Sequence, residues 1–74
     1  MRLLPTWLWR ERVGDAAFHA QSYREAHRWY EESLKENANN TGLLLKLSDV
    51  YFLFGDLENE QSYREKVYGT LRAN

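Results

Sequence analysis

Residues 22–40 read Ser-Tyr-Arg-Glu-Ala-His-Arg-Trp-Tyr-Glu-Glu-Ser-Leu-Lys-Glu-Asn-Ala-Asn-Asn, and the prediction of an α-helical protein starts from this segment. Its apolar and small residues recur at the spacing of one helix face, while charged residues take the other face. Ser22 followed three residues later by Glu25 predicts a capping box, in which each side chain accepts a hydrogen bond from the other residue's backbone amide. The asparagines after Glu36 are typical of a helix end. This helix is therefore expected to bury a stripe formed by Tyr23, Ala26, Trp29, Tyr30, Ser33 and Leu34.

The segments on either side of this stretch predict three further helices. Thr6 to Ala20 is amphipathic, and Leu43 to Phe54 resumes the helical period until Gly55. Asp56 is typical of a helix cap and predicts a fourth helix, whose more loosely spaced apolar residues are Leu57, Tyr63, Val67 and Leu71. Helices joined by connections of a few residues pack as antiparallel neighbours. The sequence therefore predicts an all-α fold of four helices in two antiparallel hairpins.

Residues 22–40 resemble the second helix and exit turn of a tetratricopeptide repeat, a family with a 34-residue period. That period gives one domain over residues 1–74, with a first repeat at 7–40 and a second at 41–74. The resemblance implies that the hairpins stack as a right-handed superhelical module. Its signature positions fall on Gly14, Ala26, Tyr30 and Ser33, then on Leu44, Leu47, Ser48, Tyr51 and the turn Gly55-Asp56-Leu57. The sequence departs from the family pattern at Arg10, Ala38 and Glu60.

A repeated pentamer offers a different register for the second hairpin. Gln-Ser-Tyr-Arg-Glu occurs at residues 21–25 and again at 61–65, a separation longer than the family period. If the two copies mark equivalent helix starts, residues 56–61 form a loop and the fourth helix begins at Ser62. Chance or local capping chemistry also accounts for the repeat, and the family register is the first choice.

The resemblance also implies a concave groove lined by the first helix of each repeat. Such a mixed acidic and aromatic surface suits a peptide with apolar anchors and a basic residue, since aromatic pockets supply affinity while rim charges steer. The expected function is a protein-interaction or assembly scaffold with a protein or peptide partner. The lining positions carried over from the family are Glu11, Asp15, Phe18, His19, Leu45, Lys46, Asp49, Phe52 and Leu53.

Composition argues against several other classes of function. The 74 residues contain no cysteine, and ten Lys plus Arg oppose eleven Asp plus Glu along the chain, so neither a thiolate site nor a nucleic-acid partner is expected. Asp15, His19 and Ser22 lie at helical spacing but lack an oxyanion turn, so a catalytic triad is not favoured. His19 and His27 lie on different helices without matching carboxylates, so no metal is expected. The chain is expected not to be an enzyme and to need no cofactor.

Two alternative roles remain open from the sequence. Two repeats are few for a stable array, so copies of the chain are expected to cover the exposed ends, and a homo-oligomer or a self-assembling piece of a longer array is the alternative function. A short tail, Leu71-Arg72-Ala73-Asn74, follows the last core residue. The basic aromatic start of the chain also suits a membrane interface, but Glu11 and Asp15 interrupt its cationic face. A soluble cytoplasmic protein without a membrane partner is the default expectation; the interfacial alternative uses Trp7, Leu8 and Trp9 with Arg2, Arg10 and Arg12.

Overall fold

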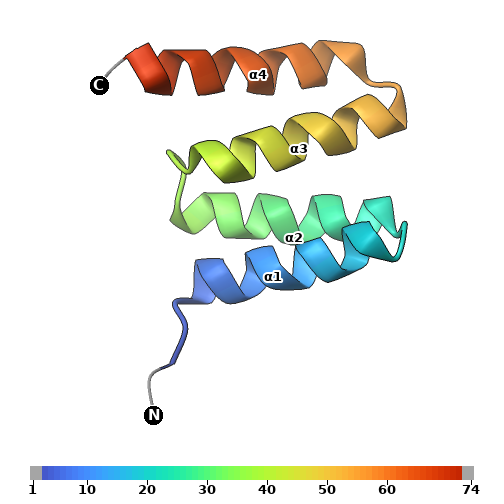
Figure 1. The fold of residues 1–74 in the computed structure, drawn as a ribbon, viewed down its shortest axis with the longest axis vertical. Helices are drawn as coiled ribbons and strands as arrows, with labels where there is room; N and C mark the ends of the chain where they lie inside the picture. The colour runs from blue at the N-terminus through green and yellow to red at the C-terminus, as the bar shows by residue number, and fades with distance from the viewer. Residues whose placement is uncertain (1–2, 73–74) are drawn as a thin grey trace.

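A computed structural model describes residues 3–72 of the chain as four α-helices that lie side by side (Figure 1). The helices are α1 (Thr6–His19), α2 (Tyr23–Glu36), α3 (Thr41–Phe54) and α4 (Leu57–Arg72). They alternate in direction, so α1 and α2 form one hairpin and α3 and α4 form the other. The all-α prediction and its four helices are confirmed. Arg2, Ala73 and Asn74, which sequence analysis included in terminal segments, lie outside the described residues.

The core of the first hairpin is built around a close approach of α1 and α2. Gly14 lies against the ring of Tyr30, where an added Cβ would meet the ring atoms Cε1 and Cδ1 at 2.6 and 2.7 Å. One turn further along α2, Ser33 donates from its hydroxyl to the carbonyl of Trp7 at 2.6 Å. Small residues at such positions let helix backbones approach closely. Trp9 and Trp29 also pack edge to face between these two helices, with ring centroids 5.6 Å apart.

The two hairpins are joined mainly through α2 and α3. Leu43, Leu47 and Val50 of α3 are fully buried in one cluster with Ala26 and Tyr30 of α2. A polar contact also crosses this boundary, because the Tyr51 hydroxyl lies 2.9 Å from Nε2 of His27. The order of packing along the molecule is therefore α1, α2, α3 and α4, with α1 and α4 at opposite edges (Figure 1).

Both hairpins turn through the same backbone motif. Gln21 and Gly55 adopt left-handed conformations, with φ of 63° and 78°. The amides of the residues that follow them, Ser22 and Asp56, donate to the carbonyls of Ala17 and Tyr51 at 2.8 and 2.9 Å. These are the bonds of a Schellman motif, which satisfies carbonyls at the end of a helix. Positions 21 and 55 are separated by one period of the predicted repeat.

The predicted capping box at Ser22 is wrong. Ser22 is the N-cap of α2, but its side chain makes no capping hydrogen bond. The Schellman turn gives Ser22 a ψ of 73°, outside the extended conformation from which an N-cap side chain usually reaches the first turn. Asn40 and Asp56 do cap their helices, because their side chains accept from the amides of Leu43 and Asn59 at 3.1 and 3.2 Å.

The alternative register for the second hairpin is also wrong. Residues 57–61 belong to α4, which begins at Leu57 rather than at Ser62. The Glu60 amide donates to the Asp56 carbonyl at 3.0 Å, so the helix has already formed before the second copy of the pentamer. Capping by the Asp56 side chain explains why α4 begins at Leu57.

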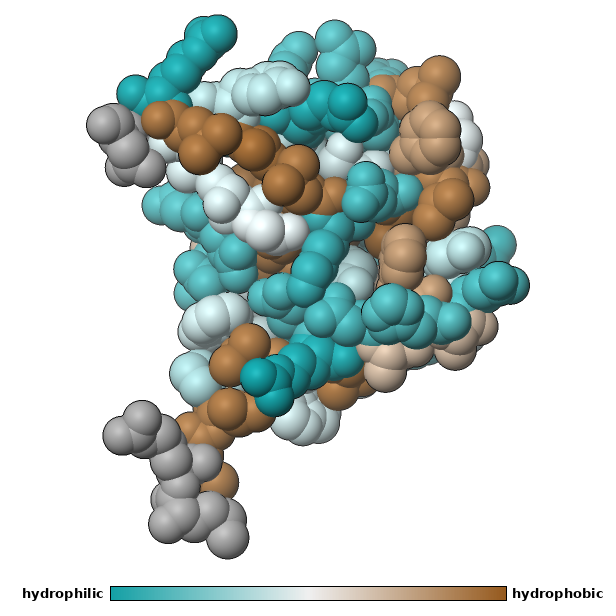
Figure 2. All heavy atoms as spheres, in the orientation of Figure 1, coloured by the Kyte–Doolittle hydropathy of each residue, from teal (hydrophilic) through white to brown (hydrophobic). Residues whose placement is uncertain are grey.

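The apolar residues predicted for α4 are buried only in part. Val67 is buried and Tyr63 is half-buried, but Leu57 and Leu71 are 62 and 59 % exposed. Large apolar side chains also reach the surface where α3 turns into α4, at the right-hand edge of Figure 2, where Phe52, Leu53 and Phe54 are exposed. The second hairpin therefore leaves much of its apolar surface uncovered.

Candidate interaction groove

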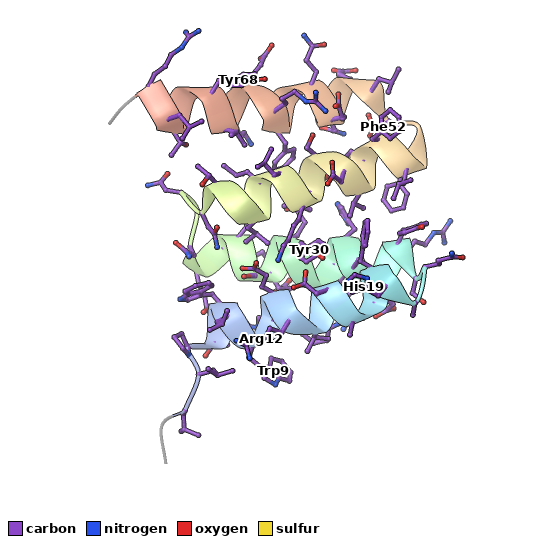
Figure 3. The ribbon with its side chains drawn as sticks, in the orientation of Figure 1. Trp9, Arg12, His19, Tyr30, Phe52 and Tyr68 are labelled. Carbon is purple, nitrogen blue, oxygen red and sulfur yellow. The ribbon has the colours of Figure 1, made fainter. Side chains whose placement is uncertain are left out.

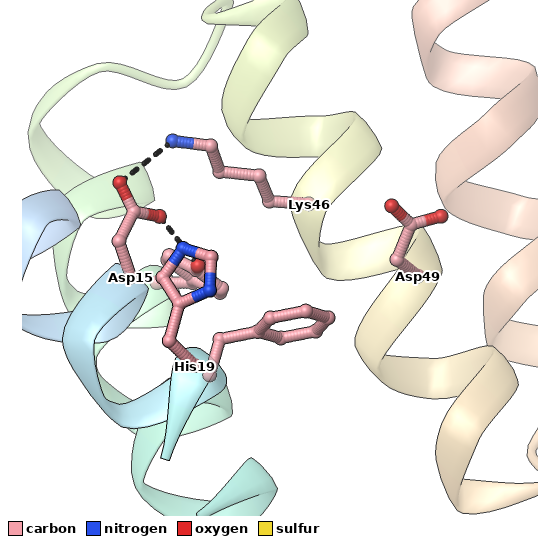
Figure 4. A pocket seen from close by; sticks show the side chains of 6 residues that line it. Asp15, His19, Lys46 and Asp49 are labelled. Atoms are coloured by element: carbon pink, nitrogen blue, oxygen red, sulfur yellow. Dashed lines mark hydrogen bonds and ion pairs between the residues drawn. The ribbon is translucent and has the colours of Figure 1, made fainter. Parts of the chain in front are cut away.

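A hollow of about 250 Å³ lies where α1, α2 and α3 meet (Figure 4). Three side chains come from the last turns of α1, one from the middle of α2 and two from the middle of α3. The α1 residues follow the helical spacing of three and four, which places them on one side of the helix. The hollow is lined by Asp15, Phe18, His19, Tyr30, Lys46 and Asp49.

Tyr30 forms a buried polar contact beneath the hollow. Its side chain is only 2 % exposed, and its hydroxyl donates to Oδ1 of Asp15 at 2.6 Å. Burial and then the hydrogen bond to the Asp15 carboxylate raise the pKa of Tyr30 above its ordinary value. Asp15 is thereby held in one orientation by a phenol that stays protonated.

Lys46 links α3 to α1 at one end of the hollow. Its Nζ donates to Oε2 of Glu11 at 2.6 Å and to Oδ2 of Asp15 at 3.1 Å. Burial by itself would lower the pKa of Lys46, but the hydrogen bonds and charges of Glu11 and Asp15 outweigh it and raise the pKa. The ammonium is therefore fixed as a cation between two carboxylates.

The other end of the hollow carries exposed side chains. Asp49 and His19 are exposed, and within residues 3–72 neither side chain makes a hydrogen bond or an ion pair. The half-buried Phe18 ring lies beside them, edge to face with His19 at a centroid distance of 6.2 Å. In and beside the hollow there are three carboxylates, those of Glu11, Asp15 and Asp49, and one ammonium, that of Lys46. This excess of negative charge favours a cation next to the aromatic ring.

The structure brings together most of the predicted groove residues. Five of them line the hollow, and Glu11 adjoins it through Lys46. Leu45 and Phe52 do not line it. They are 48 and 60 % exposed and lie outside the hollow, although helical spacing places both on the same side of α3 as Asp49. Leu53, which sequence analysis placed with them, is also outside the hollow.

Sequence reasoning missed the part of Tyr30 in this hollow. It placed Tyr30 in the core, which is right for the ring but not for the hydroxyl. A tyrosine at a core position is the signal, because a buried hydroxyl usually finds a hydrogen-bond partner. The Asp15 carboxylate, one helix away, is that partner.

The arrangement gives no support to a triad of Asp15, His19 and Ser22. The two Asp15 oxygens accept from Tyr30 and Lys46, and Ser22 lies in the turn at the start of α2. Among residues 3–72, no three His, Asp or Glu side chains are grouped as metal ligands would be. His27 belongs to a separate polar cluster, in which Glu31 accepts from the Tyr63 hydroxyl at 2.8 Å.

Comparison with protein-family models and with curated proteins finds no match to this chain. Within the part of the chain that the structure describes, no helix combines the length and the apolar character needed to cross a bilayer.

Proposed function

We propose that this chain is a protein-interaction module that binds a peptide segment of a partner protein in the hollow between α1 and α3. The observation that carries the proposal is the pairing of an aromatic wall, Phe18, with the exposed carboxylate of Asp49. A peptide with an arginine or lysine beside a large apolar residue matches both groups. The proposal involves no catalytic step.

The resemblance to a tetratricopeptide repeat is part of this proposal. Two features support it: the turns at Gln21 and Gly55 are one family period apart, and the close contact of Gly14 with Tyr30 falls at the family's tightly packed positions. In that family the first helices line the concave face. The hollow, between the first helix of each hairpin, has the same placement here.

The energetics of such a groove favour a few strong contacts. An apolar side chain packed on Phe18 loses water contact, and a cation beside Asp49 gains from the net negative charge of the hollow. Asp15 and Tyr30 are held by their mutual hydrogen bond, so the binding surface needs little reordering when a peptide enters. A rigid, partly charged groove of this kind gives selectivity for basic segments.

Selection of displayed peptides on the immobilised chain tests the proposal. Peptides that combine Arg or Lys with a large apolar residue should be enriched. Replacing Phe18 by alanine should weaken the binding of an enriched peptide by about tenfold or more, measured by fluorescence anisotropy. Phe52→Ala is the matched control, since Phe52 is an exposed phenylalanine on α3 outside the hollow. Equal losses in both variants, or no enrichment, would contradict the groove.

Self-assembly is a second candidate function, favoured by a separate observation. Both edges of the molecule expose large apolar side chains, with Leu3 and Trp9 at the α1 edge and Leu57, Tyr68 and Leu71 on α4. Exposed apolar groups at the ends of a helical stack are suited to contact with another copy. Solution mass measured by light scattering should then rise with concentration, whereas a constant monomer mass would rule out this candidate.

A further inference from the structure

Because the same turn occurs in both hairpins, the faces of the first hairpin can be compared with the corresponding faces of the second. The two Schellman turns, at Gln21 and Gly55, bring the two hairpins into register, so each position of the first hairpin has an equivalent in the second at the same offset. The face of α3 that packs on the first hairpin consists of Leu43, Leu47 and Val50, all fully buried. Its equivalents on α1 can therefore be read directly from the sequence.

The equivalent face of α1 is apolar and only partly covered, since Trp9 keeps its contact with Trp29 and Val13 is half-buried. Leu43, Leu47 and Val50 correspond to Trp9, Val13 and Ala16. Trp9 is 51 % exposed and borders an open hollow lined by Leu3, Leu4 and Thr6, and Ala16 is exposed as well. In Figure 3, Trp9 and Arg12 project from the edge of α1 that faces away from α3 and α4.

The opposite edge of the molecule offers the other half of the contact. Leu34 of α2, which packs against the buried cluster, corresponds to Tyr68 of α4. Tyr68 is 56 % exposed and lies on the edge helix opposite to α1 in Figure 3. Leu57 and Leu71 are exposed on the same helix. A second α1, placed on α4 as α3 is placed on α2, would bring Trp9 to this surface.

One of the two ion pairs of Lys46 has a charged equivalent at the same offset. The other pair, with Glu11 at 2.6 Å, has none, because Leu45 occupies the position equivalent to Glu11. Within the chain, Lys46 of α3 pairs with Asp15 of α1 at 3.1 Å. At the same offset, Arg12 is the equivalent of Lys46, and Asp49 is the equivalent of Asp15. Arg12 and Asp49 are both exposed, and within residues 3–72 neither forms an ion pair. Within residues 3–72, Arg12 on the first hairpin is thus an unpaired cation and Asp49 on the second hairpin an unpaired anion. They occupy the positions equivalent to Lys46 and Asp15, which form an ion pair inside the chain.

We propose that copies of this chain stack head to tail, with α1 of one copy against the second hairpin of the next, in the arrangement that α3 has on the first hairpin. Arg12 of one copy pairs with Asp49 of the next, and Trp9 packs against Tyr68. The two surfaces differ, so the contact is heterologous and extends into an open stack rather than a closed dimer. This inference rests on the self-assembly candidate and names its interface.

A charge exchange in the whole chain tests this interface. Arg12→Glu and Asp49→Arg each place like charges at the contact, and each should weaken self-association by about tenfold or more, measured as solution mass against concentration. An equimolar mixture of the two variants should recover association, because in an alternating stack every contact would again pair a cation with an anion. Arg24→Glu, an equal change of charge at an exposed residue of α2, should leave association unchanged.

The outcomes separate the interface from the function on which it rests. A wild-type chain that stays monomeric would remove both the self-assembly candidate and this interface. A wild-type chain that associates while both single variants associate equally well would keep self-assembly and overturn the interface. Loss of association without recovery in the mixture would also overturn it, provided that circular dichroism shows both variants to be fully helical.

Discussion

Gly14 shows how one residue limits what the first hairpin can accommodate. Because Gly14 has no side chain, the Tyr30 ring fills the space beside it, and the Tyr30 hydroxyl then reaches Asp15 in the hollow. Packing and site geometry therefore depend on the same contact. A change at Gly14 is expected to disturb both the core and the Asp15 carboxylate that lines the hollow.

Replacing Gly14 by alanine should lower the free energy of unfolding by about 1–3 kcal/mol, because the new methyl group overlaps the ring of Tyr30, which is buried and held by its hydrogen bond to Asp15. Gly69→Ala is the matched control. An added Cβ at Gly69 meets nothing within 4 Å, so this variant should gain about 0.5–1 kcal/mol from helix propensity. Urea denaturation followed by circular dichroism measures both changes. Equal effects of the two variants would show that the contact with Tyr30 is unimportant.

The turns are the elements in which local sequence and local structure disagree most. Gly55 has the residue type that a left-handed helix end favours, whereas Gln21 adopts the same conformation with a full side chain. The two turns therefore differ in backbone strain although their hydrogen bonds are the same.

Gln21→Gly should raise the free energy of unfolding by up to about 1 kcal/mol, and Gly55→Gln should lower it by a similar amount, because only glycine occupies this conformation without steric cost. Thermal denaturation of the two variants checks the opposite signs. If both variants are destabilised, the Gln21 side chain contributes contacts that outweigh its strain.

At this scale the sequence predicted the helices better than the connections. Spacing of apolar residues located all four helices to within a few residues, since burial of one face dominates helix formation. The capping box at Ser22 was wrong because capping depends on the backbone path of the turn, which a side-chain pattern does not specify. The groove residues followed the same division. Five of the predicted positions on α1 and α3 line the hollow, while Leu45 and Phe52 do not, because helical spacing gives the face on which a residue lies but not how far the hollow extends over that face.

In the whole molecule, a network of phenols and carboxylates ties the hairpins together. Burial and nearby carboxylates raise the pKa of Tyr30, Tyr51 and Tyr63, with Asp15 beside the first and Glu31 beside the other two. Folding therefore favours their protonated forms. Lys46, whose pKa is also raised, acts in the same direction.

Stability should consequently fall at alkaline pH. Below the ordinary tyrosine pKa of 10.0 both states hold these protons, and above it the unfolded chain releases protons that the folded chain retains, which favours unfolding. Denaturation midpoints measured from about pH 8 to about pH 12 should decline beyond about pH 10. Tyr63→Phe removes one of these protons and should make the decline shallower. A midpoint that stays constant over this range would contradict the assignment of the network.

The edge-to-face pair of Trp9 and Trp29 has an optical consequence. All three tryptophans of the chain, at positions 7, 9 and 29, belong to the first hairpin. The aromatic residues of the second hairpin are all tyrosine or phenylalanine. Emission excited at the red edge of the indole band therefore reports on the first hairpin alone, whereas far-ultraviolet ellipticity averages over both. If the two signals change together during denaturation, the hairpins melt as one cooperative unit; if they separate, each hairpin melts on its own.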